Sequence, residues 1–240
     1  MTQFIAHRGL SGRYPENTHL AFRKAWEADC DGIELDIQVS KDSQVLVIHD
    51  PDTQRTAGEQ HWIAETAYAD LLHLNVGLGG KGGHSRFCER IPLLTDVIAE
   101  MPSGKIVQIE IKHQIVNMDA VIAVLSNLRT DIGAQIISFD TEKLLRVRRE
   151  LPHLACFLVM DAEQPPIADR LGFAVAHGLA GLDSDYQLAT PDFSRAVLDA
   201  GLQLAHWTVN DSASAKRLMA QGAGFLASDF ADELMRSVAP

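Results

Sequence analysis

The sequence of 240 residues contains few cysteines, and they stand far apart. Cys30, Cys88 and Cys156 are odd in number and form no CxxC pair. This usage excludes a disulfide framework and a cysteine-based zinc site as the basis of the fold. We therefore interpret all three as reduced thiols that pack in the interior.

Positive charge is also scarce. Lys and Arg number 21 against 32 Asp and Glu, which gives a formal net charge of −11 at pH 7. A nucleic-acid backbone or an anionic membrane surface is bound through basic surface. We therefore expect no nucleic acid as a partner and no stable membrane association, and any site for a phosphate group must be local.

Long apolar runs are missing as well. The first ten residues, MTQFIAHRGL, lack the basic flank and the apolar run of a secretory signal, and no apolar stretch approaches the length that spans a bilayer. These features predict a soluble protein of the cytoplasm. The sequence leaves the oligomeric state open.

Short apolar runs alternate with stretches of helical period, which predicts parallel βα units. Strand-length runs occupy residues 3–8, 32–39, 45–50, 106–112, 134–139, 155–160, 179–184, 203–210 and 224–228. Helices are expected over residues 16–29, 93–101, 119–129, 141–151, 190–201 and 211–222. The chain is therefore of the α/β class.

The second and third runs break this alternation, because the segment between them is too short for a crossover helix and predicts an antiparallel hairpin. Without the return arm, eight strands remain, which favours a closed (β/α)8 TIM barrel. An open doubly wound sheet is the alternative, but neither GxGxxG nor GxxxxGK[ST] follows any strand. Residues 51–90 hold one short helix near 65–73 and a glycine-rich loop. We interpret them as a small insertion after the hairpin, within a single domain of residues 1–240.

Two acids interrupt the second apolar run. Glu34 and Asp36 stand two residues apart, so both side chains project from the same face of the strand. A hairpin turn centred between Asp42 and Ser43 would set His49 opposite Asp36. The hairpin therefore predicts a patch of two acids and one histidine.

Other chemically active residues stand at the ends of two further runs. Glu110 and Lys112 repeat the spacing of two, and the first run ends in His7, Arg8 and Gly9, where glycine permits a sharp turn or a close backbone approach. In a parallel barrel these residues lie at the carboxyl ends of the strands, where barrel enzymes build their sites. We expect one site at that end.

The inward charges could be simple ion pairs, Glu34 with Arg8 and Glu110 with Lys112. Burying so many charged groups is a poor way to stabilise a core, because each must be removed from water. A metal ion accounts for the excess of acids. Glu34, Asp36 and Glu110 are oxygen ligands, which suit a divalent metal ion such as Mg²⁺ or Ca²⁺.

The charge of this site suggests its substrate. Three carboxylates, a divalent cation, Arg8 and Lys112 leave one net positive charge, which a phosphodiester monoanion would neutralise. Displacement at phosphorus needs an acid for the leaving oxygen and a base for the nucleophile. His7 and His49 suit these roles, because histidine titrates near neutral pH.

With these residues, the chain resembles the glycerophosphodiester phosphodiesterase family. The similar motifs are HRG at 7–9, PENT at 15–18, ELD at 34–36, HD at 49–50, IPLLTDV at 91–97, EIK at 110–112, SFD at 138–140 and WTVN at 207–210. The resemblance implies a TIM barrel with a small insertion after the HD motif, and metal-dependent hydrolysis of a small-molecule glycerophosphodiester to glycerol 3-phosphate and an alcohol. The 2-hydroxyl of the glycerol is often proposed as the nucleophile in this family.

The resemblance also implies roles for single residues. It implies His7 and His49 as the acid–base pair, Glu34, Asp36 and Glu110 as metal ligands, Arg8 and Lys112 as phosphate contacts, and Trp207 as an apolar wall for the glycerol moiety. The last strand departs from the family pattern, which resembles GVDGIITD, because GAGFLASDF at 222–230 keeps only Asp229.

Several polar residues lie outside these roles. We favour a helix cap for Asn17 and a supporting role for Glu16, and we expect His206 to pack on the helix side of its strand. Asp183 and Asp185 receive no role.

Two alternative functions are open. One is a phosphodiesterase of the same fold that cleaves lysophospholipids, although residues 75–86 offer little of the apolar surface that it would need. The other is a barrel that binds a phosphorylated metabolite without turnover. The presence of His7 and His49 argues against the second alternative, because binding alone does not require two proton carriers.

Overall fold

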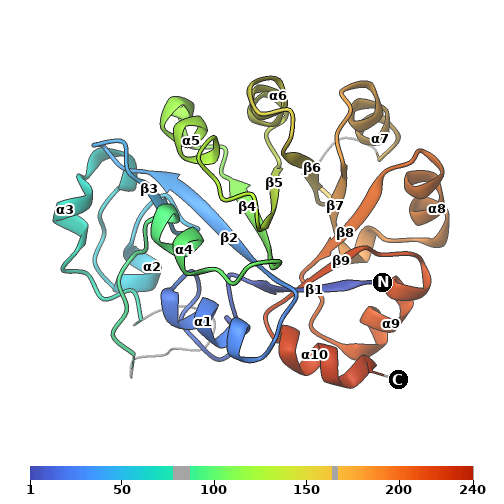
Figure 1. Ribbon diagram of the computed structural model, residues 1–240, viewed down its shortest axis with the longest axis horizontal. Helices are drawn as coiled ribbons and strands as arrows, with labels where there is room; N and C mark the ends of the chain where they lie inside the picture. Colours follow the sequence, from blue (N-terminus) through green and yellow to red (C-terminus); the bar gives the residue numbers. More distant parts are fainter. Residues whose placement is uncertain (78–86, 164–166, 240) are drawn as a thin grey trace.

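The computed structural model describes residues 1–77, 87–163 and 167–239. Within them, eight parallel strands form a closed barrel (Figure 1). These are β1 (Gln3–His7), β2 (Gly32–Val39), β4 (Ile106–Ile111), β5 (Gly133–Ser138), β6 (Ala155–Met160), β7 (Gly181–Asp185), β8 (Gln203–Trp207) and β9 (Phe225–Ser228). The barrel closes because β1 pairs with both β2 and β9. The predicted TIM barrel is therefore confirmed.

Helices surround the strands (Figure 1). They are α1 (His19–Glu27), α4 (Leu94–Glu100), α5 (Met118–Leu125), α6 (Thr141–Glu150), α7 (Ile167–Ala176), α8 (Pro191–Asp199), α9 (Ser212–Ala220) and α10 (Ala231–Val238), with a 3-10 turn η2 (Tyr186–Leu188) before α8. The six predicted helices are present, whereas α7 and α10 were not predicted. The glycine within α7, Gly172, weakens its helical signal. None of the described helices is long and apolar enough to cross a membrane.

The predicted hairpin is present, but its register is wrong by one residue. β3 (Val45–Val47) pairs antiparallel with β2, and Val47 stands opposite Ile37. The amide of Ile48 donates to the carbonyl of Asp36 at 2.9 Å. Ile48, rather than His49, therefore lies opposite Asp36.

The turn explains the shift. Ser40 and Gln44 close it, with the Ser40 amide donating to the Gln44 carbonyl at 2.9 Å, so its centre is Asp42. Ser43 adopts a positive φ of 66°, a left-handed conformation typical of three-residue hairpin loops. The extra loop residue moves the pairing by one position, which the residue pattern did not reveal.

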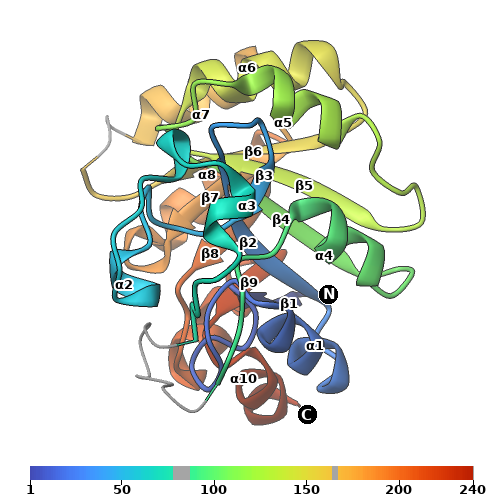
Figure 2. The same cartoon turned by 90° about the vertical axis from the view of Figure 1, so that its left-hand side faces the viewer.

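The insertion between β3 and α4 lies at one side of the barrel, beside β2 (Figures 1 and 2). The helix predicted near 65–73 is α3 (Tyr68–Leu71), and it is preceded by α2 (Gln54–Ala57) and the 3-10 turn η1 (Ile63–Glu65). The insertion packs against β3 and against Ile91, which precedes α4, in one apolar cluster. The buried residues of this cluster are Leu46, Ile48, Ala57, Ile63, Leu71, Leu74, Val76 and Ile91. Most of the predicted glycine-rich loop, residues 78–86, lies outside the described residues.

The barrel interior is separate from the core between strands and helices. Its apolar cluster comprises Ile5, Ile106, Ile137, Phe157, Val159, Ala205, Phe225 and Ala227. Phe157 and Phe225 meet at right angles with ring centroids 5.8 Å apart, and they fill the barrel on the side away from the carboxyl ends of the strands. The charged side chains described below stand above this apolar layer, at the carboxyl ends of the strands.

Two of the three cysteines pack as predicted. Cys30 and Cys156 are buried and unpaired, and burial raises the pKa of Cys30 to about 12 and that of Cys156 to about 11. Cys88 is exposed, so the prediction is wrong for it. It lies near the end of the insertion and belongs to neither main core.

His206 on β8 is buried, and its Nδ1 lies 2.9 Å from the hydroxyl of Ser184. Its neighbours Ala205 and Trp207 belong to the interior cluster, so His206 faces the helices, as predicted. Burial lowers the pKa of His206 to about 4.

Acid should therefore destabilise the fold through His206. An unfolded histidine has a pKa of about 6.5, so below that pH the unfolded chain binds a proton that the folded chain does not. The stability that neutral His206 contributes is complete above pH 6.5 and falls progressively towards pH 4. We expect wild type to lose about 2 kcal/mol more than His206→Gln between pH 7 and pH 5 in urea unfolding. Equal losses in the two proteins would contradict this assignment.

Candidate active site

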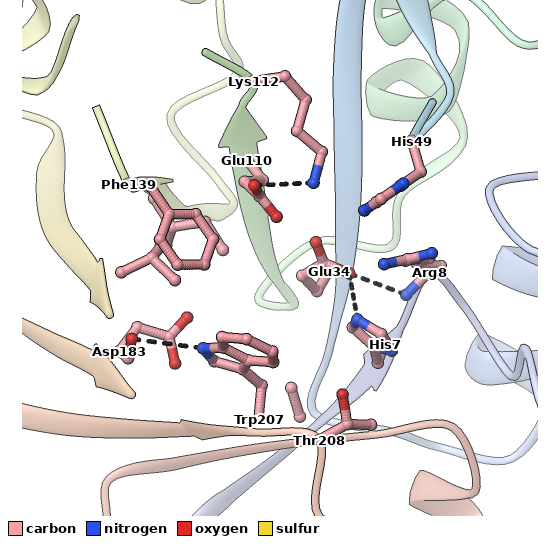
Figure 3. Close-up of a pocket in the computed structure, with 13 residues that line it drawn as sticks. His7, Arg8, Glu34, His49, Glu110, Lys112, Phe139, Asp183, Trp207 and Thr208 are labelled. Atoms are coloured by element: carbon pink, nitrogen blue, oxygen red, sulfur yellow. Dashed lines mark hydrogen bonds and ion pairs between the residues drawn. The ribbon is translucent and has the colours of Figure 1, made fainter. Parts of the chain in front are cut away.

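A pocket of about 320 Å³ opens at the carboxyl ends of the strands (Figure 3). It is lined by His7, Arg8, Glu34, His49, Glu110, Lys112, Ile137, Phe139, Val159, Asp183, Trp207, Thr208 and Ala227. Seven of the eight predicted site residues are therefore brought together at its surface. The eighth, Asp36, is fully buried next to it.

The imidazole of His7, at the end of β1, is held by one acid and faces another. Its Nδ1 lies 2.8 Å from Oδ1 of Asp229, and its Nε2 lies 3.9 Å from Oε2 of Glu34. Asp229 also accepts hydrogen bonds from the hydroxyl of Ser11 at 3.0 Å and from the side-chain amide of Asn210 at 2.8 Å. A carboxylate held in this way accepts the Nδ1 proton of His7 and leaves Nε2 available to the pocket. Burial lowers the pKa of His7, although Asp229 acts in the opposite direction.

His49, in the segment after β3, also has its Nδ1 held by a carboxylate. Its Nδ1 lies 2.7 Å from Oδ1 of Asp50, whose other oxygen accepts a hydrogen bond from Nε of Arg55 at 2.5 Å. Burial lowers the pKa of His49 as well. His49 reaches the pocket despite the shifted register because β3 ends at Val47. The backbone carbonyl of His49 is then held by the side-chain amide of Gln38 at 3.1 Å.

Arg8 adopts a backbone conformation that is unusual for its residue type. Its φ is 57°, in the left-handed region, and its amide donates to Oε2 of Glu34 at 2.9 Å. Gly9 follows with φ of 78°, and a Cβ there would lie 2.6 Å from Cβ of Ala21. The predicted close approach at Gly9 is therefore confirmed.

The guanidinium of Arg8 lies among acids. It donates to Oε1 of Glu16 at 2.9 Å, and its Nε lies 3.1 Å from Oδ2 of Asp36. Burial acts against the charge of Arg8, but the carboxylates of Asp36 and Glu16 outweigh it and raise the pKa of Arg8. Arg55 binds the same Glu16 through two hydrogen bonds of 2.7 and 2.8 Å. Glu16 therefore holds both arginines beside the pocket, and its supporting role stays a prediction.

Asn17 is not the cap of α1, contrary to the prediction. Thr18 caps the helix by accepting a hydrogen bond from the amide of Ala21. Asn17 has φ of 57°, and its side-chain amide donates to Oδ2 of Asp36 at 2.8 Å. Asparagine tolerates the left-handed region better than most residues, so it can turn its side chain towards the site.

The three acids differ in their surroundings. Both oxygens of Asp36 contact donors or cations, and Nζ of Lys112 lies 2.6 Å from Oδ1 of Asp36. Burial acts against ionisation of Asp36, but Lys112 and Arg8 outweigh it and hold its pKa well below the usual range. Burial, followed by the charge of Asp36, raises the pKa of Glu34 well above its usual range. Burial raises the pKa of Glu110 to about 7, although Lys112 lies 2.8 Å away.

These acids fit a hard divalent cation. One oxygen from each of Glu34, Asp36 and Glu110 lies within 4.8 Å of the others. Glu34 and Glu110 face the pocket with less positive charge around them than Asp36 has. Oxygen ligands that converge in this way, with excess negative charge, suit Mg²⁺ or Ca²⁺ rather than a soft metal.

The opposite wall of the pocket is apolar (Figure 3). Trp207 and Phe139 meet edge to face with ring centroids 5.9 Å apart, and Nε1 of Trp207 donates to the carbonyl of Asp183 at 3.4 Å. Among the described residues that line the pocket, Asp183 is the one acid on this wall, and the sequence analysis gave it no role. Its neighbour Asp185 instead accepts a hydrogen bond from the amide of Gln187 at the start of η2.

Comparisons with known proteins show the family of the chain. Residues 7–233 match the glycerophosphoryl diester phosphodiesterase family. A glycerophosphodiester phosphodiesterase of Caldanaerobacter subterraneus is 30% identical over 243 residues, which cover 99% of this chain and 98% of that protein. A human lysophospholipase D is 35% identical over 132 residues, or 53% of this chain and 41% of that protein.

A solved structure supports the fold. It is a phosphodiesterase of Oleispira antarctica in complex with the product sn-glycerol-3-phosphate. Its TM-score is 0.87 at 24% identity, with 99% of this chain and 97% of that chain covered. The family match spans nearly the whole barrel. This chain belongs to the glycerophosphoryl diester phosphodiesterase family.

Proposed function

We propose that the protein hydrolyses small glycerophosphodiesters to glycerol 3-phosphate and an alcohol. The observation that carries this proposal is the pairing of His7 and His49. Each binds a carboxylate through Nδ1 and has its second nitrogen left for a pocket that also holds Arg8 and Lys112. One imidazole can take the proton of the attacking hydroxyl, while the other gives a proton to the leaving oxygen.

The phosphate would bind between the cations. The planar guanidinium of Arg8 suits two phosphate oxygens, and Lys112 supplies a point charge. Trp207 and Phe139 then form the wall for the glycerol carbons on the opposite side (Figure 3).

A divalent cation, Mg²⁺ or Ca²⁺, would be held by Glu34, Asp36 and Glu110. When bound, it supplies Lewis-acid stabilisation of the charge on the phosphoryl oxygens. Nζ of Lys112 contacts both Asp36 and Glu110, at 2.6 and 2.8 Å. A cation bound to these two acids would compete with Lys112 for them and make the lysine available to the phosphate.

A product assay tests the proposal. Purified protein with Mg²⁺ or Ca²⁺ is incubated with glycerophosphocholine, glycerophosphoethanolamine and glycerophosphoglycerol, and the released phosphates are identified. We expect glycerol 3-phosphate from all three. Release of phosphocholine from glycerophosphocholine would show that the bond between phosphorus and the glycerol oxygen is cleaved, which contradicts the proposal. No turnover of any diester would favour a barrel that binds a phosphorylated metabolite without turnover.

One observation favours lysophospholipids as a second substrate class. A groove of about 410 Å³ lies between the end of β2, η1 and residues 114–117 after β4, at the same end of the barrel as the site. Trp62 and Val116 border it and are 47% and 95% exposed. This apolar surface lies outside the segment 75–86, which led us to disfavour such substrates. Faster release of choline from lysophosphatidylcholine than from glycerophosphocholine would establish this alternative.

Asp229 is proposed to position His7. In Asp229→Asn, the side-chain amide can turn an N–H towards Nδ1 and stabilise the wrong tautomer of His7. We expect kcat to fall about 10- to 100-fold, with the metal affinity nearly unchanged, because supporting residues of this kind have effects of that size. Ser11→Ala removes one donor to Asp229 and should cost less. An Asp229→Asn enzyme with unchanged kcat would show that the contact with His7 is structural.

A cytoplasmic enzyme without a nucleic-acid partner, formed as a single domain by residues 1–240, remains our proposal from the sequence.

A further inference from the structure

Asp183 on β7 is a buried acid whose chemistry the proposed reaction does not use. Its side chain is 2% exposed and points into the pocket from the apolar wall (Figure 3). Its Oδ1 has no hydrogen-bond partner in the part of the chain that the structure describes. A buried carboxyl oxygen without a donor is costly, because the contacts that it made with water are lost and not replaced. Such an atom in a pocket points to a ligand that supplies the missing partner.

The position of Asp183 limits what this ligand group can be. The cations and both histidines stand at the end of β1 and in the segments directly after β1, β3 and β4, whereas Asp183 stands across the pocket beside Trp207 and Phe139. A ligand with its phosphate at the cations must therefore reach Asp183 with the part most distant from the phosphate. Around Asp183 the walls are apolar, which suits carbon atoms that carry one hydrogen-bonding group.

The state of the carboxyl favours a hydroxyl over an ammonium group. Burial, followed by the charge of Glu110, raises the pKa of Asp183 to about 8. A neutral carboxyl both donates and accepts, so it pairs with a hydroxyl, which does the same. A primary ammonium group only donates, the quaternary ammonium of choline has no N–H, and either would favour the ionised form of the carboxyl.

We propose that Asp183 is a specificity-determining residue that binds the terminal hydroxyl of the glycerol moiety and thereby selects glycerol over deoxygenated alcohols. This inference rests on the proposed function for the identity of the ligand. Asp183 would thus supply the polar contact on the apolar wall, because the ring N–H of Trp207 already donates to the carbonyl of Asp183.

The test compares two ligands that differ in this hydroxyl alone: sn-glycerol 3-phosphate and the matching 1,2-propanediol 1-phosphate. Calorimetry with Mg²⁺ or Ca²⁺ present measures the dissociation constants for wild type, Asp183→Val and Asp183→Asn. We expect wild type to prefer glycerol 3-phosphate about 10- to 100-fold, the usual size of one buried hydrogen bond of this kind. Asp183→Val should reduce this preference to less than about threefold, and Asp183→Asn, which can donate and accept, should keep most of it.

Two further readouts separate this contact from a structural role. Asp183→Val removes an unpaired buried polar group from a strand, so its melting temperature should equal or exceed that of wild type while the preference is lost. In turnover, the penalty of Asp183→Val should be the same for glycerophosphocholine and glycerophosphoglycerol. A penalty confined to glycerophosphocholine would mean that Asp183 binds the ammonium group and would overturn the inference.

The result that contradicts the inference is an unchanged preference in Asp183→Val, or an equal loss of affinity for both phosphates. The proposed function fails in a different way. If wild type binds the two phosphates with the expected preference but cleaves no diester, the contact of Asp183 stands and the hydrolytic reaction does not.

Discussion

Replacing His7 or His49 by alanine is expected to lower kcat for glycerophosphodiesters by about 10²- to 10⁴-fold, the usual contribution of one general acid or base. Asp229 holds Nδ1 of His7, and Asp50 holds Nδ1 of His49. Each imidazole is therefore fixed on its own side of the pocket, and neither can take over the role of the other. Binding of glycerol 3-phosphate should change much less, because the phosphate contacts come from other residues. Initial rates with glycerophosphocholine measure the effect.

The control is His206→Gln, which alters a buried histidine on the opposite face of a barrel strand. It should keep near-normal turnover at pH 7.5, where His206 is neutral in both the folded and the unfolded chain. Circular dichroism shows whether each variant is folded. A folded His7→Ala or His49→Ala enzyme with wild-type turnover would remove that residue from the mechanism, and an unfolded one would show that the histidine is structural.

The second large effect is expected at the metal ligands. Glu34→Gln and Glu110→Gln should each weaken the binding of Mg²⁺ or Ca²⁺ by about 100-fold or more, because each removes a charged oxygen from a set of three. Turnover should fall with metal occupancy and recover in part at high metal concentration. Calorimetric titration of the metal measures the affinity independently of activity, and the exposed Glu142→Gln on α6 is the control.

The same two variants should be more stable than wild type without metal and less stable than wild type with metal. In a chelator, burial and the charge of Asp36 disfavour the ionised forms of Glu34 and Glu110, which is why the pKa of each is raised. A glutamine, which carries no charge, should therefore raise the melting temperature above that of metal-free wild type. With saturating metal the order should reverse. Lower stability of both variants in the chelator would indicate that the acids act mainly as ion pairs with Arg8 and Lys112.

The barrel and most of the site could be predicted because they depend on local patterns. Alternation of strands and helices predicts parallel βα units, and a spacing of two places Glu34 with Asp36 and Glu110 with Lys112 on single faces. The shared carboxyl end of parallel strands then brings these residues together. The ion pairs of the alternative reading are also present in part, since Lys112 contacts Glu110.

What could not be predicted depends on single turns and on distant contacts. One extra residue in the loop at Asp42 shifts the hairpin register. A left-handed φ at Asn17 turns its side chain from the helix start to Asp36. The contact of His7 with Asp229 joins residues 222 positions apart. Periodicity carries no information on such pairs, although Asp229 was notable as the acid kept from the family's closing pattern.

The most direct test of the account is removal and return of the metal. Protein treated with a chelator and then freed of it is assayed for release of glycerol 3-phosphate from glycerophosphocholine, before and after addition of Mg²⁺ or Ca²⁺. We expect turnover to stop in the metal-free protein, which stays folded, and to return with the added cation as Glu34, Asp36 and Glu110 bind it. Full turnover in the metal-free protein would contradict the central claim.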